Sequence, residues 1–165
     1  MFTVPRYRVI TQDEWNSIQS SLDAQEFPPI YSALKHDAQE NMGRSNYRSA
    51  LIELAMTCEI FLRSMVLKRL PSSLSSTLVV AIEEVNISQY VAKHFRALVT
   101  EKDEVNFGKL SKELTSLFDK RNKLLHMGKS EGVTKENCER FLRVANDLLN
   151  FEHKLSSSES NVLVP

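Results

Sequence analysis

Residues 121–128 contain the side chains of this chain whose types and spacing best suit chemistry. Arg121 is followed directly by Asn122, and His126 lies five positions after the arginine. An arginine presents a planar fork of donors that matches phosphate oxygens. A histidine exchanges protons near neutral pH and often acts as a general acid or base. The segment therefore predicts chemistry directed at a phosphate.

Arg121 interrupts an apolar stripe on the helix expected over residues 106–127. The members of this stripe are Phe107, Leu110, Leu114, Leu117, Phe118 and Leu125. With Phe107 at zero degrees on a helical wheel, Arg121 falls at about −40°. A guanidinium that faces a core keeps its charge, so it needs a carboxylate, a carbonyl or a bound anion. An arginine in such a stripe is more often snorkelling or salt-bridged than catalytic, so both interpretations stay open.

The spacing of the motif predicts a homodimer. Asn122 and His126 are four residues apart, so they share one edge of the helix and can bind a common ligand. Arg121 and His126 are about 140° apart on the same helix and converge poorly within one chain. A two-fold axis near the motif sets both copies around one phosphate. The side of the long preceding helix that carries Ile52, Met56 and Arg63 is a candidate interface.

Charge is balanced over the whole chain but not along it. The 165 residues contain 21 basic and 21 acidic side chains. Residues 11–59 carry a net charge of −5, whereas residues 119–129 carry a net charge of +3. The candidate contacts to an anionic ligand are Lys120, Lys123, Lys129 and Arg48. A charge cluster is usually only a solvated face, so this basic cluster supports the motif without defining a site.

Composition favours one soluble domain. The length suits one compact domain with its own core. No apolar run is long enough to span a bilayer, and the first ten residues lack the apolar segment of a secretory signal, so we expect a cytoplasmic protein without membrane contact. Cys58 and Cys138 lie on predicted apolar helix faces and are expected to be buried thiols.

Neither a cofactor nor a metal site is expected. The four histidines are dispersed, at His36, His94, His126 and His153, and show no metal-ligand spacing. The chain has no glycine-rich phosphate loop and no C-x-x-C or H-E-x-x-H motif.

Helical periodicity dominates the chain, so the fold class expected is all-α. Apolar residues recur every three to four positions, and glycine and proline are rare. The helix expected over about residues 45–70 has one apolar stripe, and the last helix has another. The members of the first stripe are Tyr47, Leu51, Leu54, Ala55, Cys58, Phe61, Leu62 and Met65, and those of the second are Cys138, Phe141, Leu142, Ala145, Leu148 and Leu149. We expect an arm over residues 1–10, in which Val9 and Ile10 pack against the body, and a short helix capped by Thr11. Together they form an N-terminal part over 1–29. An up-and-down helical bundle follows over 30–155, and 156–165 reads as a disordered tail. Within the bundle, residues 78–85 favour a helix over a strand, Ser88 is the expected cap of the next helix, and Thr134 caps the last.

Residues 121–126, R-N-K-L-L-H, resemble the R-x-x-x-x-H signature of the HEPN family of helical proteins. The long helix upstream, with the sequence YRSALIELAMTCE from Tyr47 to Glu59, is similar to the family's typical helix, and a final amphipathic helix follows the motif. The resemblance covers about residues 30–155. It implies a metal-independent endoribonuclease that works as a homodimer in toxin–antitoxin or defence systems, with an antitoxin-like protein as a further partner.

By this resemblance each motif residue has a role. Arg121 binds the scissile phosphate and His126 transfers protons. Glu59 orients Arg121, and Asn122 helps to position the arginine and the histidine. Glu53 fits less well because it lies on a different side of its helix. The products implied are a 2′,3′-cyclic phosphate and a 5′-hydroxyl. With RNA as the implied substrate, the four basic side chains named above are the candidate RNA contacts.

Two other interpretations remain at this stage. In the first, a non-catalytic HEPN-like module binds RNA, a nucleotide or a protein through the same pocket. In the second, the chain is a helical scaffold in which Arg121 and Glu59 form only a buried ion pair.

Overall fold

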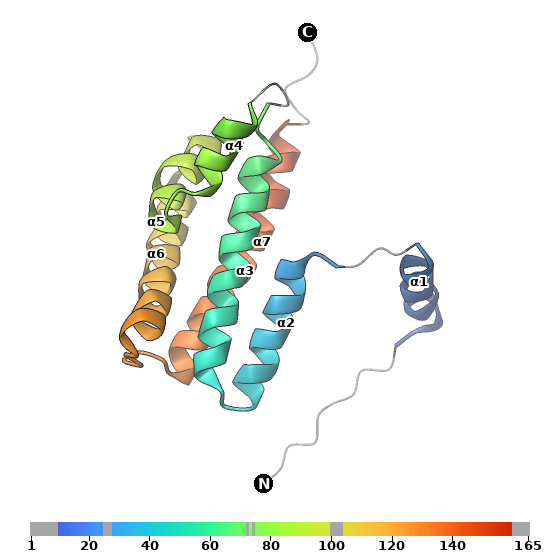
Figure 1. The fold of residues 1–165 in the computed structure, drawn as a ribbon. Coiled ribbons are helices and arrows are strands. Elements are labelled where there is room, and N and C mark those ends of the chain that lie inside the picture. The colour runs from blue at the N-terminus through green and yellow to red at the C-terminus, as the bar shows by residue number, and fades with distance from the viewer. Residues whose placement is uncertain (1–9, 25–27, 72, 74, 100–103, 160–165) are drawn as a thin grey trace.

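The structure is a computed structural model that describes residues 10–24, 28–71, 73, 75–99 and 104–159. Within these ranges all regular secondary structure is helical, which confirms the all-α expectation. Helices α2 (Ile30–Gly43), α3 (Tyr47–Leu67), α6 (Glu104–Met127) and α7 (Lys135–Glu159) run side by side as a bundle (Figure 1). None of the described helices is long and apolar enough to cross a membrane.

Helix α3 is the central element of the bundle because it packs against α2, α6 and α7. Its apolar residues recur at helical spacing, and the predicted stripe is buried from the second turn to the last. The buried members are Ala50, Leu51, Leu54, Ala55, Cys58, Phe61, Leu62, Met65 and Val66. Tyr47, at the start of the stripe, is partly buried and packs against this core.

The segment between α3 and α6 is built from short helical pieces. Helix α4 (Ser76–Glu83) confirms that the ambiguous apolar run is helical. It is followed by α5 (Ile87–Gln89), a π-helical turn over Tyr90–Phe95 and a 3-10 turn over Arg96–Leu98. The prediction that Ser88 caps this region was wrong. Asn86 is the cap, and its side chain accepts a 2.9 Å hydrogen bond from the Ser88 N–H.

Helices α6 and α7 are joined by a short loop that depends on two glycines. Gly128 has a φ of +63°, and the next N–H, of Lys129, donates to the Lys123 carbonyl at 3.2 Å, which ends α6. Gly132 has a φ of +75°, and a Cβ at this position would clash with the Lys120 Nζ. The Thr134 hydroxyl then accepts from the Asn137 N–H at 3.3 Å, as expected for the cap of α7.

Three further expectations are corrected by the structure. Leu125 is exposed, whereas Leu124 packs against the core, so the buried face of α6 rotates in its last turn. Such rotation follows when packed helices cross at an angle. Helix α7 continues to Glu159, so residues 156–159 are helical rather than part of a disordered tail. Ile10 is exposed instead of packing on the bundle; residues 1–9 and 160–165 lie outside the described residues.

The N-terminal helix α1 (Gln12–Asp23) stands apart from the bundle. Thr11 and Glu14 form the predicted capping box, with the Glu14 carboxylate accepting from the Thr11 N–H at 2.9 Å. Figure 1 shows α1 beyond α2, on the opposite side of the bundle from α6. No residue of α1 is buried. The fold thus consists of one packed body and one solvent-exposed helix.

Candidate functional site

Arg121 pairs with Glu59 across the α3–α6 interface. The Arg121 Nη2 donates to the Glu59 Oε2 at 2.5 Å. The two side chains retain 19% and 24% of their exposure, so the pair is largely withdrawn from water. A short, charge-assisted bond of this kind is stronger than a neutral hydrogen bond. Glu59 is therefore placed beside Arg121, and the pair lies at the edge of the core.

Glu59 is shared between two guanidinium groups. Its second oxygen, Oε1, accepts from the Nη2 and Nε of Arg63, one turn later in α3, at 3.1 and 3.3 Å. Both carboxylate oxygens are thus occupied by different arginines, and this fixes the orientation of the carboxylate. Two guanidinium groups and one carboxylate leave one formal positive charge in the cluster of Glu59, Arg63 and Arg121.

Arg63 is itself held by the segment that follows α3. Its Nη2 also donates to the Val85 carbonyl at 3.1 Å. Its guanidinium lies 5.0 Å from the centroid of the Tyr90 ring, within cation–π range. The Tyr90 hydroxyl donates to the Arg63 carbonyl at 3.4 Å. The cluster is therefore tied to the π-helical turn as well as to α3 and α6.

Arg121 keeps unused hydrogen-bonding capacity. Its Nε is enclosed and has no hydrogen-bond partner among the described residues. A guanidinium has five N–H donors in a fixed fork, and Glu59 takes only one of them. Arg121 therefore has hydrogen-bond donors that Glu59 does not use.

The other motif residues lie at the end of α6. Asn122 is partly buried, and His126 is exposed in the last turn of the helix. Within one chain the structure brings Arg121 together with Glu59 but records no contact between Arg121 and His126. Glu53, the carboxylate that fitted less well, binds elsewhere, since both of its oxygens accept from the Asn41 Nδ2 at 2.9 Å.

The four candidate RNA contacts divide into two groups. Arg48 of α3 reaches the α6–α7 loop, where its Nη2 donates to the Ser130 hydroxyl at 3.3 Å. This contact brings Arg48 close to the loop that carries the exposed Lys129. Lys123 instead pairs with Asp119 at 2.8 Å, which raises its pKa, and the Lys120 ammonium packs on Gly132. Arg48 and Lys129 are thus better placed than the other two to meet an anionic ligand near His126.

Sequence reasoning missed the part that Arg63 plays in this cluster. It assigned Arg63 to a subunit interface, whereas the structure binds it to Glu59, Val85 and Tyr90. The available signal was the spacing of four between Glu59 and Arg63, which favours an ion pair on one helix face. The contacts to the segment after α3 had no signal in the sequence, because they depend on how that segment folds back.

Buried thiols and possible metal ligands do not add to the cluster. Burial raises the pKa of Cys58 to about 12 and that of Cys138 to about 11, so neither thiol ionises near neutral pH. Among the described residues, no three His, Cys, Asp or Glu side chains gather closely enough to hold a metal ion.

The chain was compared with protein-family models, with curated proteins and with solved structures, and it matches none of them.

Proposed function

We propose that the protein is a metal-independent endoribonuclease of the HEPN type, with the Arg121–Glu59 cluster at its active site. The observation that carries the proposal is the partly buried Arg121, held by Glu59 at 2.5 Å and positioned five residues before His126 on the same helix. A structural ion pair needs neither a shared carboxylate nor spare donors. Here the carboxylate is shared with Arg63, and the cluster keeps a net positive charge beside the motif.

In the proposed reaction the RNA supplies its own nucleophile. The 2′-hydroxyl attacks the adjacent phosphorus, the P–O5′ bond breaks, and a 2′,3′-cyclic phosphate and a 5′-hydroxyl result. Arg121 binds the non-bridging oxygens, where negative charge increases in the transition state. One His126 imidazole takes the proton from the 2′-hydroxyl or donates one to the leaving oxygen. Asn122 positions the phosphate or the imidazole, and Arg48 and Lys129 bind flanking phosphates, with Lys120 and Lys123 at the margin.

A homodimer completes the proposed site. Arg121 faces the core side of α6, whereas His126 is exposed at the end of the helix, so a second copy is needed to set both groups around one phosphate. The face of α3 next to the cluster carries Ile52, which is partly buried, and Met56, which is exposed. This face is the proposed interface between the two copies.

The proposal includes a biological role: the nuclease acts in the cytoplasm as a toxin or defence protein, with an antitoxin-like protein as its partner.

A non-catalytic binding module is the second candidate. It is favoured by the low exposure of Arg121 and by its pairing with Glu59, which neutralises part of its charge. Such a module binds RNA, a nucleotide or a protein through the same cluster without cleaving a bond.

The test is cleavage of end-labelled RNA by the purified protein in EDTA. We expect fragments that end in a 2′,3′-cyclic phosphate, and a loss of about 10²–10³-fold in rate for Arg121→Ala and for His126→Ala. Arg140→Ala is the matched control, because Arg140 also pairs with a glutamate across two helices but lies outside the motif.

Three outcomes decide between the candidates. RNA that stays intact with the wild-type protein, or equal cleavage by all variants, contradicts the nuclease. Binding without cleavage that is lost in Arg121→Ala supports the second candidate. A strict monomer in size-exclusion chromatography with light scattering contradicts the shared site.

A further inference from the structure

Arg63 and Arg121 bind Glu59 with the same edge of their guanidinium groups, but to different extents. In an arginine, Nε and Nη2 form one edge of the planar group, which matches the two oxygens of a carboxylate. Arg63 uses this whole edge, because its Nε and Nη2 both donate to the Glu59 Oε1, at 3.3 and 3.1 Å. Arg121 donates to Glu59 from Nη2 alone, and its enclosed Nε has no hydrogen-bond partner among the described residues. The Arg121–Glu59 contact is therefore half of the bidentate pair that these two groups can form.

Arg63 occupies the oxygen that the second bond to Arg121 would need. A bidentate pair places both oxygens of Glu59 on Arg121, but Oε1 accepts from Arg63 instead. Arg63 is also anchored independently of Glu59, because it donates to the Val85 carbonyl at 3.1 Å and lies 5.0 Å from the centroid of the buried Tyr90 ring. A side chain that is itself fixed thus holds Oε1 away from the Arg121 Nε.

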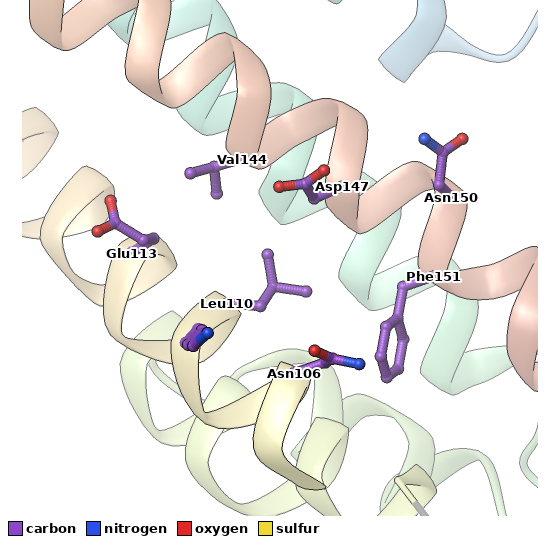
Figure 2. Close-up of a pocket in the computed structure, with 8 residues that line it drawn as sticks. Asn106, Leu110, Glu113, Val144, Asp147, Asn150 and Phe151 are labelled. Carbon is purple, nitrogen blue, oxygen red and sulfur yellow. The ribbon is translucent and has the colours of Figure 1, made fainter. Parts of the chain in front are cut away.

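A second arginine–glutamate pair on α6 shows why the enclosure of Glu59 is important. The Arg140 Nε lies 3.2 Å from Glu113 and also has no hydrogen-bond partner among the described residues. Glu113, however, stands at the wall of a pocket of about 580 Å³ between α6 and α7 (Figure 2), and its side chain keeps 40% of its exposure. Water competes with Arg140 for this carboxylate. The Glu59 side chain keeps only 24%, so an oxygen that Arg63 releases has little water to bind and turns to the unpaired Nε of Arg121.

The sharing of Glu59 also determines the charge that Arg121 presents. One carboxylate between two guanidinium groups leaves one formal positive charge among Glu59, Arg63 and Arg121, whereas a carboxylate paired with Arg121 alone leaves none. Interactions between charges are stronger in a site with little water than in bulk solvent. The sharing therefore favours a negatively charged ligand at Arg121.

We propose that Arg63 is a positioning residue for phosphate binding by Arg121. By holding one oxygen of Glu59, Arg63 keeps this carboxylate from binding Arg121 bidentately, and Arg121 retains the positive charge that attracts the phosphate. The inference rests on the proposed function, in which Arg121 binds the scissile phosphate. Arg63 acts through Glu59 and contacts neither the RNA nor the reacting atoms.

The Nε–H group of Arg121 provides an NMR signal that needs no RNA. Its resonance in a proton–nitrogen correlation spectrum is identified by its loss in Arg121→Lys. Arg63→Met removes the guanidinium but keeps an apolar side chain beside Tyr90, so Glu59 is able to bind Arg121 with both oxygens. We expect the Arg121 proton signal to move downfield, because the proton enters a charge-assisted hydrogen bond. Arg63→Gln is a second neutral variant that can still donate to the Val85 carbonyl, and it is expected to move the signal in the same direction.

Binding is measured with a 2′-O-methyl RNA oligonucleotide, which lacks the attacking 2′-hydroxyl and therefore stays intact. Arg63→Met is expected to weaken this binding about tenfold, because Glu59 then neutralises Arg121 fully. Arg63→Lys keeps a cation at the Glu59 Oε1 and should bind close to the wild type. Adding Glu59→Gln to Arg63→Met removes the neutralising charge, so the double variant should bind more tightly than Arg63→Met alone. A merely structural role of Arg63 predicts instead that the two losses add.

Arg69→Met is the matched control for the loss of a partly buried arginine. Arg69 lies just past the end of α3 and donates to the Met65 carbonyl at 3.2 Å, so its variant should leave the Arg121 signal unchanged and the RNA affinity close to that of the wild type. An unmoved Arg121 signal in Arg63→Met, or a further loss of binding in the double variant, overturns this inference and leaves the proposed function intact. Wild-type protein that binds the oligonucleotide no more tightly than Arg121→Ala contradicts the proposed function, and the inference falls with it.

Discussion

Helix α6 takes part in two arginine–glutamate pairs that differ in almost every physical respect. Toward α3, Arg121 binds Glu59 through a 2.5 Å hydrogen bond, and the side chains keep 19% and 24% of their exposure. Toward α7, Glu113 lies 3.2 Å from Arg140, and both side chains keep 40% of theirs. The two facing atoms of this second pair have no hydrogen-bond partner among the described residues.

The difference shows that an ion pair is defined by its surroundings as much as by its partners. Arg140 spreads its contacts over the Ser116 hydroxyl and the Phe141 ring, at 3.3 and 4.7 Å, so Glu113 is one neighbour among several. Glu59, in contrast, holds two arginines with its two oxygens. Removing Glu59 leaves two cations in a site with little water, whereas removing Glu113 leaves a more exposed arginine that keeps its contacts with Ser116 and Phe141.

The largest contrast is expected from removing the two carboxylates. Glu59→Ala is expected to lower the free energy of unfolding by about 2–3 kcal/mol, because it leaves two partly buried guanidinium groups unpaired. Glu113→Ala is expected to cost less than about 1 kcal/mol, as for exposed pairs. Urea unfolding of both variants measures the difference. Equal losses of unfolding free energy in the two variants would show that the lower exposure of Glu59 does not make its ion pair more stabilising.

Double-mutant cycles compare the same two pairs by their coupling energies. The coupling between Glu59 and Arg121 is expected to be about 1–2 kcal/mol, because the bond is short and shielded from solvent. For Glu113 and Arg140 we expect at most about 0.5 kcal/mol. The cycles use single and double alanine variants in urea unfolding. If the position of Arg140 over the Phe141 ring depends on Glu113, the coupling energy of the Glu113–Arg140 pair will instead be the larger of the two.

Periodicity in the sequence was sufficient to predict most of the fold. Apolar residues at helical spacing on α3 and α7 include buried ones such as Leu54, Phe61 and Leu148, because a helix buries one side at a fixed angular interval. The segment after α3 was harder to predict. Its π-helical turn over Tyr90–Phe95 depends on packing between α3 and α6 and leaves no regular spacing.

The candidate site could be predicted only in part. The wheel position of Arg121 required an anionic or polar partner, and the structure supplies Glu59. The spacing of four indicates that Glu59 can also bind Arg63, but the contacts of Arg63 with the Val85 carbonyl and the Tyr90 ring depend on how the segment after α3 folds back, which the sequence does not specify. Leu125 was placed on the stripe by an ideal 100° period, but the crossing of the helices buries Leu124 instead.

A variant of Arg63 tests whether the sharing of the Glu59 carboxylate contributes to stability. Arg63→Gln is expected to lower the free energy of unfolding by about 1 kcal/mol, because the side chain loses its charged bond to Glu59 and the contact with the Tyr90 ring. This cost should shrink in a Glu59→Ala background, since the two residues then no longer interact. An undiminished cost would place the contribution of Arg63 in contacts other than the one with Glu59, such as those with Val85 and Tyr90.

The smallest effect on stability, and the most informative, is expected for Arg121→Lys. An ammonium keeps the charge opposite Glu59, so the free energy of unfolding should change by less than about 1 kcal/mol. It lacks the planar fork, however, and cannot bind Glu59 and a phosphate along fixed directions at the same time. RNA cleavage should therefore fall about as far as in Arg121→Ala, whereas Arg140→Lys should leave both cleavage and stability close to wild type. If Arg121→Lys cleaves RNA normally, only the charge of Arg121 is used, and the geometry of the cluster serves the fold.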